Sequence, residues 1–171
     1  KLLMGVDSNL NGTLETNEVL NVSYLCDGVT TEYVFMTEIF AEGSHSLGLK
    51  TDGTLWAWGS NYTGQFGNGT TTSETTPVQV GSGYSAISAE AEHSFGIKTD
   101  GTLWAWGRNF SGLLGDGTIE SKTTPVQVGS GYSAISAGDY HSLGLKTDGT
   151  LWAWGANSNG SFGNGTTTSE T

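Results

Sequence analysis

The chain has 171 residues and an unusual composition, with 27 glycines, 6 tryptophans and only 13% charged residues. Abundant glycine, threonine and aromatic residues, with little lysine, glutamate or leucine, favour strands and turns over helices. The formal net charge of −11 would repel phosphate backbones, so we expect no nucleic-acid partner. No apolar run approaches the roughly 18 residues that a membrane-spanning helix needs, so we expect no membrane insertion.

Residues 1–36 differ from the rest of the chain and contain one twelve-residue segment, 7–18, that matches an EF-hand-type calcium loop. Gly12 stands where such a loop turns sharply, and oxygen-bearing residues occupy the liganding positions. These residues are Asp7, Asn9, Asn11, Thr13 (through its carbonyl), Glu15 and Glu18. A hard cation needs about six to eight oxygens around one point, so the spacing predicts a calcium site. The alternative is an Asn-Gly turn without metal.

The single cysteine, Cys26, allows no disulfide within this sequence. It is either a plain buried thiol or half of a bond whose partner lies outside the sequence. The segment from Asp7 to Gly28 resembles the end of a small Asp/Asn-rich module of bacterial secreted proteins, on the pattern D-x-N-x-N-G-x-L-x-x-x-E-V followed by Y-x-C-x-G. That resemblance implies a bacterial protein that is extracellular or on the cell surface. It also implies a disulfide partner upstream of Lys1.

From Thr37 onward the chain repeats with a period of 48 residues. The stretch HSLGLKTDGTLWAWG at 45–59 returns almost unchanged at 93–107 and 141–155. A period of about 20–50 residues indicates a solenoid, a propeller or an array. We place the repeats at 37–84, 85–132 and 133–171. The third copy stops before the PVQV segment of the other two, so we expect a longer protein.

Each repeat predicts four short strands: YSAISA or its equivalent, HSLGLK, TLWAW and PVQV. Asp-Gly between alternating apolar runs predicts a two-residue type I′ hairpin turn between the second and third strands. A glycine-rich loop, N-x-x-G-x-x-G-x-G, precedes the fourth strand, which begins with proline. At a first strand position the missing N–H of proline does no harm.

The hairpin turn decides which side chains share a face. If Asp52-Gly53 forms a two-residue turn, Leu49 pairs with Trp56. Leu47 then pairs with Trp58, and these four side chains form one bulky face. The other face would be nearly flat, with Gly48 opposite Ala57 and Ser46 opposite Gly59. The bulky face of one unit could then nest on the flat face of the next, whereas a three-residue turn would break this pairing.

The repeat resembles that of the regulator-of-chromosome-condensation family. The pattern is G-x-x-H-S-L-x-L-x-x-D-G-x-L-W-x-W-G-x-N-x-x-G-Q-F-G-x-G, then P-V-x-V, and it spans 43–80 and, nearly as fully, 91–128. The resemblance covers residues 37–171 and implies a seven-bladed β-propeller with one repeat per blade. We therefore expect an all-β partial propeller of about three four-stranded blades, preceded by the short calcium-loop segment.

The repeated histidines His45, His93 and His141 could suggest a metal set. Each occupies the same place in its own repeat, so a structural role explains all three. The glycine-rich loops lack the G-x-x-x-x-G-K-[ST] pattern of a phosphate cradle. Glu90 and Glu92 of the second repeat stand against Asp139 of the third, and Asp116 stands against Asn68 of the first. These acidic residues show no paired catalytic geometry, so we expect no enzymatic activity.

The leading hypothesis is a non-enzymatic protein-interaction scaffold, extracellular or on the cell surface, with a calcium-stabilised N-terminal segment. The resemblance implies binding of an unknown protein partner through the blade loops, which vary most at 61–65, 109–113 and 157–161. One alternative is an accessory propeller of a larger extracellular enzyme. Another is a guanine-nucleotide exchange factor, which we disfavour because the resemblance implies an insertion and a basic tail for that role, and this sequence has neither.

Overall fold

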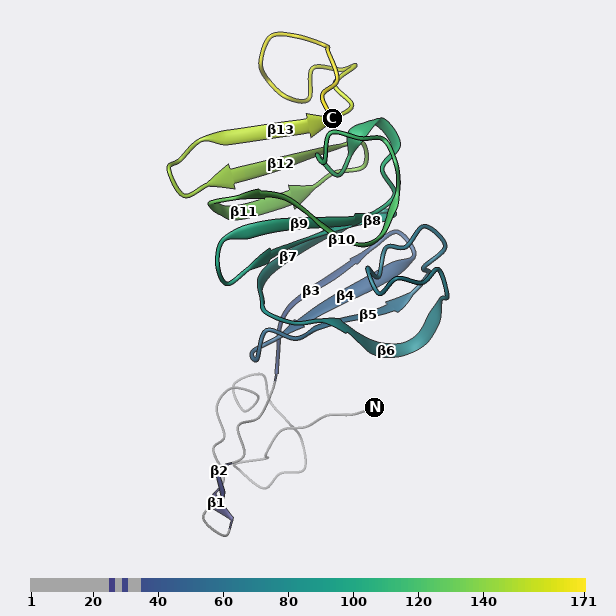
Figure 1. Ribbon diagram of the computed structural model, residues 1–171, viewed down its shortest axis with the longest axis vertical. Coiled ribbons are helices and arrows are strands. Elements are labelled where there is room, and N and C mark those ends of the chain that lie inside the picture. Colours follow the sequence, from purple (N-terminus) through teal and green to yellow (C-terminus); the bar gives the residue numbers. More distant parts are fainter. Residues whose placement is uncertain (1–24, 27–28, 31–34) are drawn as a thin grey trace, which may run out of the picture. The chain divides into compact units, whose positions relative to one another are not determined.

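The computed structural model describes residues 25–26, 29–30 and 35–171 (Figure 1). The chain divides into two units, residues 1–35 and 36–171. In the first unit, strands β1 (Leu25–Cys26) and β2 (Val29–Thr30) form a short antiparallel pair. The six predicted calcium ligands, from Asp7 to Glu18, lie outside the described residues, and the calcium site therefore stays a prediction.

The second unit consists of three antiparallel sheets, which we call blades 1, 2 and 3. Blade 1 comprises β3 (Met36–Glu42), β4 (His45–Lys50), β5 (Leu55–Gly59) and β6 (Glu74–Gly81). Blade 2 comprises β7 (Tyr84–Glu90), β8 (His93–Lys98), β9 (Thr102–Gly107) and β10 (Lys122–Ser130), with the short 3₁₀ helix η1 (Phe110–Gly112) in its long loop. Blade 3 comprises β11 (Tyr132–Ala137), β12 (His141–Lys146) and β13 (Leu151–Gly155).

The predicted all-β class and blade architecture are confirmed. Within each blade the strands pair in sequence order, and the three sheets stack face to face (Figure 1). Blade 3 has three strands, and an isolated bridge joins Gly155 to Glu170. This bridge has the same position as the pairing of Gly59 with Glu74 in blade 1. Within the described residues, no helix combines the length and the apolar character that crossing a membrane would require.

The predicted two-residue hairpin turn is wrong. The Lys50 amide donates to the Thr54 carbonyl at 3.0 Å, and the Gly53 amide donates to the Lys50 carbonyl at 2.9 Å, which leaves a loop of three residues. The Asp52 carboxylate accepts hydrogen bonds from the amide and hydroxyl of Thr54, at 2.9 and 2.6 Å. Gly53 has φ +76°, a conformation that favours glycine. A three-residue loop ending in such a glycine is the next most common hairpin turn.

The longer loop shifts the register by one residue and so changes which side chains share a face. Leu49 pairs with Leu55 rather than with Trp56, and Leu47 pairs with Ala57. Each tryptophan lies opposite a small residue, with Trp56 across from Gly48 and Trp58 across from Ser46. Every blade therefore has two different faces. We call one the leucine face, which in blade 1 carries Leu47, Leu49 and Leu55, and the other the tryptophan face, which carries both tryptophans. They replace the predicted bulky and flat faces.

The blades stack by packing the leucine face of one onto the tryptophan face of the next. The core between blades 1 and 2 contains Leu47, Leu49, Leu55, Ala57, Phe66, Tyr84, Ile87, Ala89 and Trp106. Trp106 is fully buried, and its indole N–H donates to the Gln65 carbonyl of blade 1 at 2.8 Å. Trp154 repeats this contact on the Leu113 carbonyl of blade 2, also at 2.8 Å. Apolar burial and one indole hydrogen bond thus hold each pair of neighbours together.

His45 and His93 lie buried at the same interfaces, whereas His141 of blade 3 is only partly buried. The His45 Nε2 atom is 3.2 Å from the Ser94 hydroxyl of the next blade, and that hydroxyl donates to the Gln65 carbonyl at 2.9 Å. Burial, with the nearby His45 as a second cause, lowers the pKa of His93 to about 4. A buried neutral imidazole between blades fits the structural role predicted from the sequence.

Candidate interaction face

The glycine-rich loop of each blade is built around one fully buried asparagine. In blade 1, the Asn61 side-chain carbonyl accepts from the Phe66 amide at 3.0 Å. Its side-chain amide donates to the Thr70 and Thr72 carbonyls, both at 3.1 Å. Asn109 and Asn157 make the same bonds in blades 2 and 3. Hydrogen bonds from the buried asparagine therefore fix the backbone of each loop. The other side chains of the loop can differ between blades without changing its conformation.

The differences between repeats gather at one end of the blades. At that end the first and second strands meet, the third strand stops and the glycine-rich loop begins (right side of Figure 1). We call it the variable end. In blades 1, 2 and 3 respectively, corresponding positions hold Gly43, Ala91 and Asp139; Ser44, Glu92 and Tyr140; Ser60, Arg108 and Ala156; Tyr62, Phe110 and Ser158; and Gln65, Leu113 and Ser161.

The opposite end, which we call the hairpin end, is the same in every repeat. The loop T-D-G-T recurs unchanged between the second and third strands, and each preceding lysine lies over a tryptophan ring. The Nζ atoms of Lys50, Lys98 and Lys146 lie 3.7, 4.3 and 4.4 Å from the ring centroids of Trp56, Trp104 and Trp152. One lysine and one aspartate per hairpin leave this end electrically balanced.

At the variable end, acidic residues outnumber basic residues. Among its acidic residues are Glu74, Glu90, Glu92, Asp116, Glu120, Asp139 and Glu170. Arg108 and Lys122 are the basic residues there. Arg108 pairs with Glu92, while Lys122 lies 3.5 Å from Asp116 and 3.6 Å from Glu120. This end therefore presents a net negative surface, which favours cationic partners.

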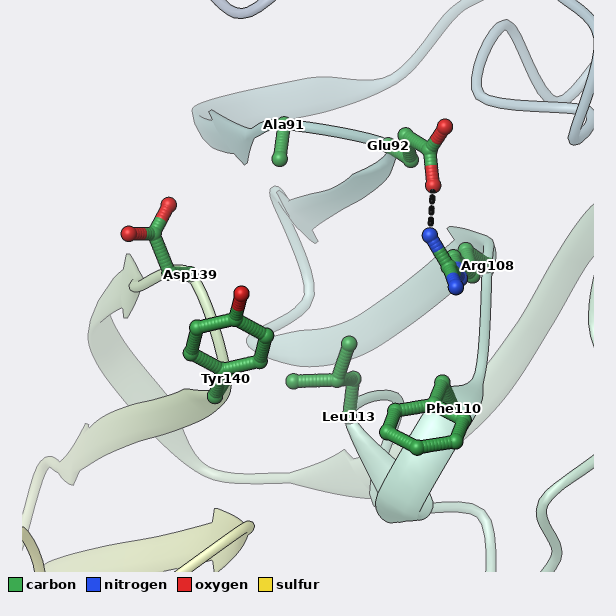
Figure 2. Close-up of a pocket in the computed structure, with 7 residues that line it drawn as sticks. All are labelled: Ala91, Glu92, Arg108, Phe110, Leu113, Asp139 and Tyr140. Atoms are coloured by element: carbon green, nitrogen blue, oxygen red, sulfur yellow. Dashed lines mark hydrogen bonds and ion pairs between the residues drawn. The ribbon is translucent and has the colours of Figure 1, made fainter.

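A hollow of about 350 Å³ opens at the variable end between blades 2 and 3 (Figure 2). Blade 2 contributes Ala91, Glu92, Arg108, Phe110 and Leu113, and blade 3 contributes Asp139 and Tyr140. Phe110 and Tyr140 are 61% and 64% exposed, whereas Leu113 is buried. The hollow thus combines an apolar base, two accessible rings and carboxylates.

The predicted binding loops 61–65, 109–113 and 157–161 all lie at the variable end. Sequence reasoning missed the turn residues 91–92 and 139–140 that complete the hollow. A comparison of the repeats position by position contains that signal, because these turns differ in every copy. In the described part of the chain, no three His, Cys, Asp or Glu side chains are grouped so as to hold a metal ion.

Stacked four-stranded blades of this kind define a β-propeller repeat protein. Residues 52–96 and 126–161 match the model of the regulator of chromosome condensation (RCC1) repeat. The chain belongs to the RCC1-repeat family of β-propellers, as the sequence resemblance indicated.

Solved structures share this fold. Prp20p from Saccharomyces cerevisiae matches with a TM-score of 0.69 at 21% identity, over 79% of this chain and 36% of that protein. Yeast RCC1 (Prp20) bound to Kap60 matches with a TM-score of 0.65 at 25% identity, over 75% and 31%. Human WBSCR16 matches with a TM-score of 0.66 at 19% identity, over 75% and 35%. The chain spans about a third of the length of these proteins.

Proposed function

We propose that this chain is a protein-interaction scaffold that binds its partner through the variable end. The observation that carries the proposal is the distribution of differences among three otherwise near-identical repeats. The hairpin end repeats unchanged, and the residues that differ most in character lie around the loops at the other end. The buried asparagines hold the loop backbone in all three blades. Recognition is the role that such residues on a rigid scaffold usually serve.

The structural relatives are consistent with protein binding. One solved structure is a complex of yeast RCC1 with Kap60, and Prp20p was described together with its binding to Gsp1p and histones. Those partners belong to the relatives, and we infer from them only the class of function. We propose no catalytic activity for this chain.

The proposal is tested by changing each end of the blades separately. Arg108→Ala and Phe110→Ser give blade 2 the residues that blade 3 has at the same positions, so the scaffold already tolerates them. A matched control carries Ser82→Arg and Thr99→Arg, two exposed residues at the hairpin end. Proteins that crosslink to the parent chain are identified by mass spectrometry and then titrated in purified form. We expect the variable-end variant to lose the partner and the control to retain it, whereas the reverse pattern would refute the proposal.

We further propose that residues 7–18 bind calcium and that the protein acts outside the cell. The calcium proposal rests on the spacing of Asp7, Asn9, Asn11, Thr13, Glu15 and Glu18. The location rests on the resemblance to a module of bacterial secreted proteins. Calorimetric titration of the parent with calcium is expected to give binding heat that Glu18→Gln removes and Glu32→Gln, the same charge change outside the loop, leaves intact. Equal heats for the parent and Glu18→Gln would contradict the site.

A further inference from the structure

We propose that the hollow between blades 2 and 3 takes a basic side chain, arginine or lysine, of the partner protein. The inference rests on the proposed function and adds the chemistry that the partner must supply. Three features support it: the side chains that line the hollow, the charge of the hollow, and the different residues at the equivalent junction between blades 1 and 2.

The walls fit the stem and head of a long cationic side chain. Phe110 and Tyr140 are large rings that remain mostly exposed, and buried Leu113 lies between them (Figure 2). Aromatic faces attract guanidinium and ammonium groups, and apolar surface accommodates their methylene stems. The chain shows the same chemistry internally, because the Arg108 guanidinium lies 5.7 Å from the Phe110 ring centroid while pairing with Glu92.

The charge of the hollow leaves one carboxylate to pair with a ligand. Glu92 is neutralised by its ion pair with Arg108 (Figure 2). Within residues 35–171, the Asp139 carboxylate accepts no hydrogen bond and pairs with no lysine or arginine. A cation that enters beside Tyr140 would meet this uncompensated charge, and an anion would be repelled by it.

The corresponding position between blades 1 and 2 keeps one exposed ring, Tyr62, but differs in its other features. There Gln65 replaces Leu113, and its buried side-chain carbonyl accepts from the Thr63 amide at 3.0 Å. The Thr63 hydroxyl donates across the junction to the Glu92 carbonyl at 3.2 Å. Glu92 stands where blade 3 has Tyr140, and Arg108 already neutralises its carboxylate. We therefore assign the cation site to the junction of blades 2 and 3 alone.

The test uses the ¹⁵N-labelled full chain and four capped pentapeptides of the form Gly-Gly-X-Gly-Gly. X is arginine, lysine, citrulline (a neutral analogue of arginine) or norleucine. We expect the arginine and lysine peptides to shift the amide resonances of Phe110, Leu113, Asp139 and Tyr140, with weaker binding at high salt. The citrulline and norleucine peptides should bind about fivefold more weakly, the loss expected for one exposed ion pair.

Two substitutions and a control locate the site. Asp139→Asn should weaken binding of the arginine peptide about fivefold, and Phe110→Ser should weaken it about threefold through loss of one cation–π contact. Glu120→Gln removes an acid from the same end but outside the hollow, and should leave the affinity unchanged. Equal binding of arginine and citrulline, or shifts that map away from the hollow, would overturn the inference. Neither result would contradict the proposed function if substitutions at the variable end still abolish partner binding. If those substitutions leave partner binding unchanged, the proposed function itself is wrong.

Discussion

Replacing Trp106 with alanine tests how the blades are held together. The indole is fully buried between blades 1 and 2, its ring centroid lies 5.9 Å from that of Tyr84, and its N–H donates to the Gln65 carbonyl at 2.8 Å. Removing a buried tryptophan costs about 3–5 kcal/mol through lost apolar burial and the cavity left behind. Loss of the indole hydrogen bond to the Gln65 carbonyl, which keeps its bond from the Ser94 hydroxyl, adds about 1 kcal/mol. We therefore expect Trp106→Ala to lower the free energy of unfolding by about 4–6 kcal/mol.

The control is Trp152→Ala, which removes a tryptophan that is 51% exposed at the hairpin end of blade 3. Its ring lies under Lys146 and donates to the Thr150 hydroxyl, so we expect a cost of about 1 kcal/mol. Urea unfolding followed by circular dichroism gives both values, provided that the slopes with denaturant agree. Similar costs for the two substitutions would show that burial of the tryptophan face does not hold the blades together.

Three further outcomes are expected. His93 has a pKa of about 4 in the folded chain against 6.5 in the unfolded chain, so the unfolded chain binds the proton first as the pH falls. The free energy of unfolding should therefore decrease by about 3 kcal/mol between pH 6.5 and pH 4. His93→Gln should make the free energy of unfolding less dependent on pH in that range, and an unchanged slope would argue against burial of the neutral ring. Gly96→Ala would place a Cβ atom 2.4 Å from the Tyr84 ring and should cost about 2 kcal/mol or more, whereas Gly48→Ala at the same position of blade 1 meets a flexible methionine and should cost less in the same urea assay. Asn109→Ala removes the buried bonds that shape the loop of blade 2 and should lower stability by about 2–3 kcal/mol, with amide exchange rising first in residues 110–121.

The hairpin register was not determined by the sequence signal alone. The Asp-Gly signal located the turn correctly, but two- and three-residue loops share that signal. The choice depended on Asp52, whose carboxylate binds the Thr54 amide and hydroxyl and so supports the longer loop. One residue of difference moved Trp56 from beside Leu49 to beside Gly48, because side chains alternate between the two faces of a strand.

The register also changes which tryptophan matters for stability. With the two-residue turn expected from the sequence, Trp56 would lie on the bulky face, and Trp56→Ala would cost about 3–5 kcal/mol if that ring were buried between blades. The ring is only half-buried, with the Lys50 Nζ atom 3.7 Å from its centroid. The large decrease in the free energy of unfolding is therefore expected for Trp106, the second tryptophan of the blade 2 hairpin. Blade 1 covers the face of blade 2 that carries this residue.

The sequence by itself determined the repeat unit, the all-β class and the family, because strand alternation, hairpin signals and a 48-residue period are local properties of the chain. It also contained the spacing of the proposed calcium loop. Only the tertiary structure decided that Phe110 of blade 2 and Tyr140 of blade 3 line one hollow with Asp139. That proximity arises because each leucine face packs on the next tryptophan face, which sets how the ends of neighbouring blades meet.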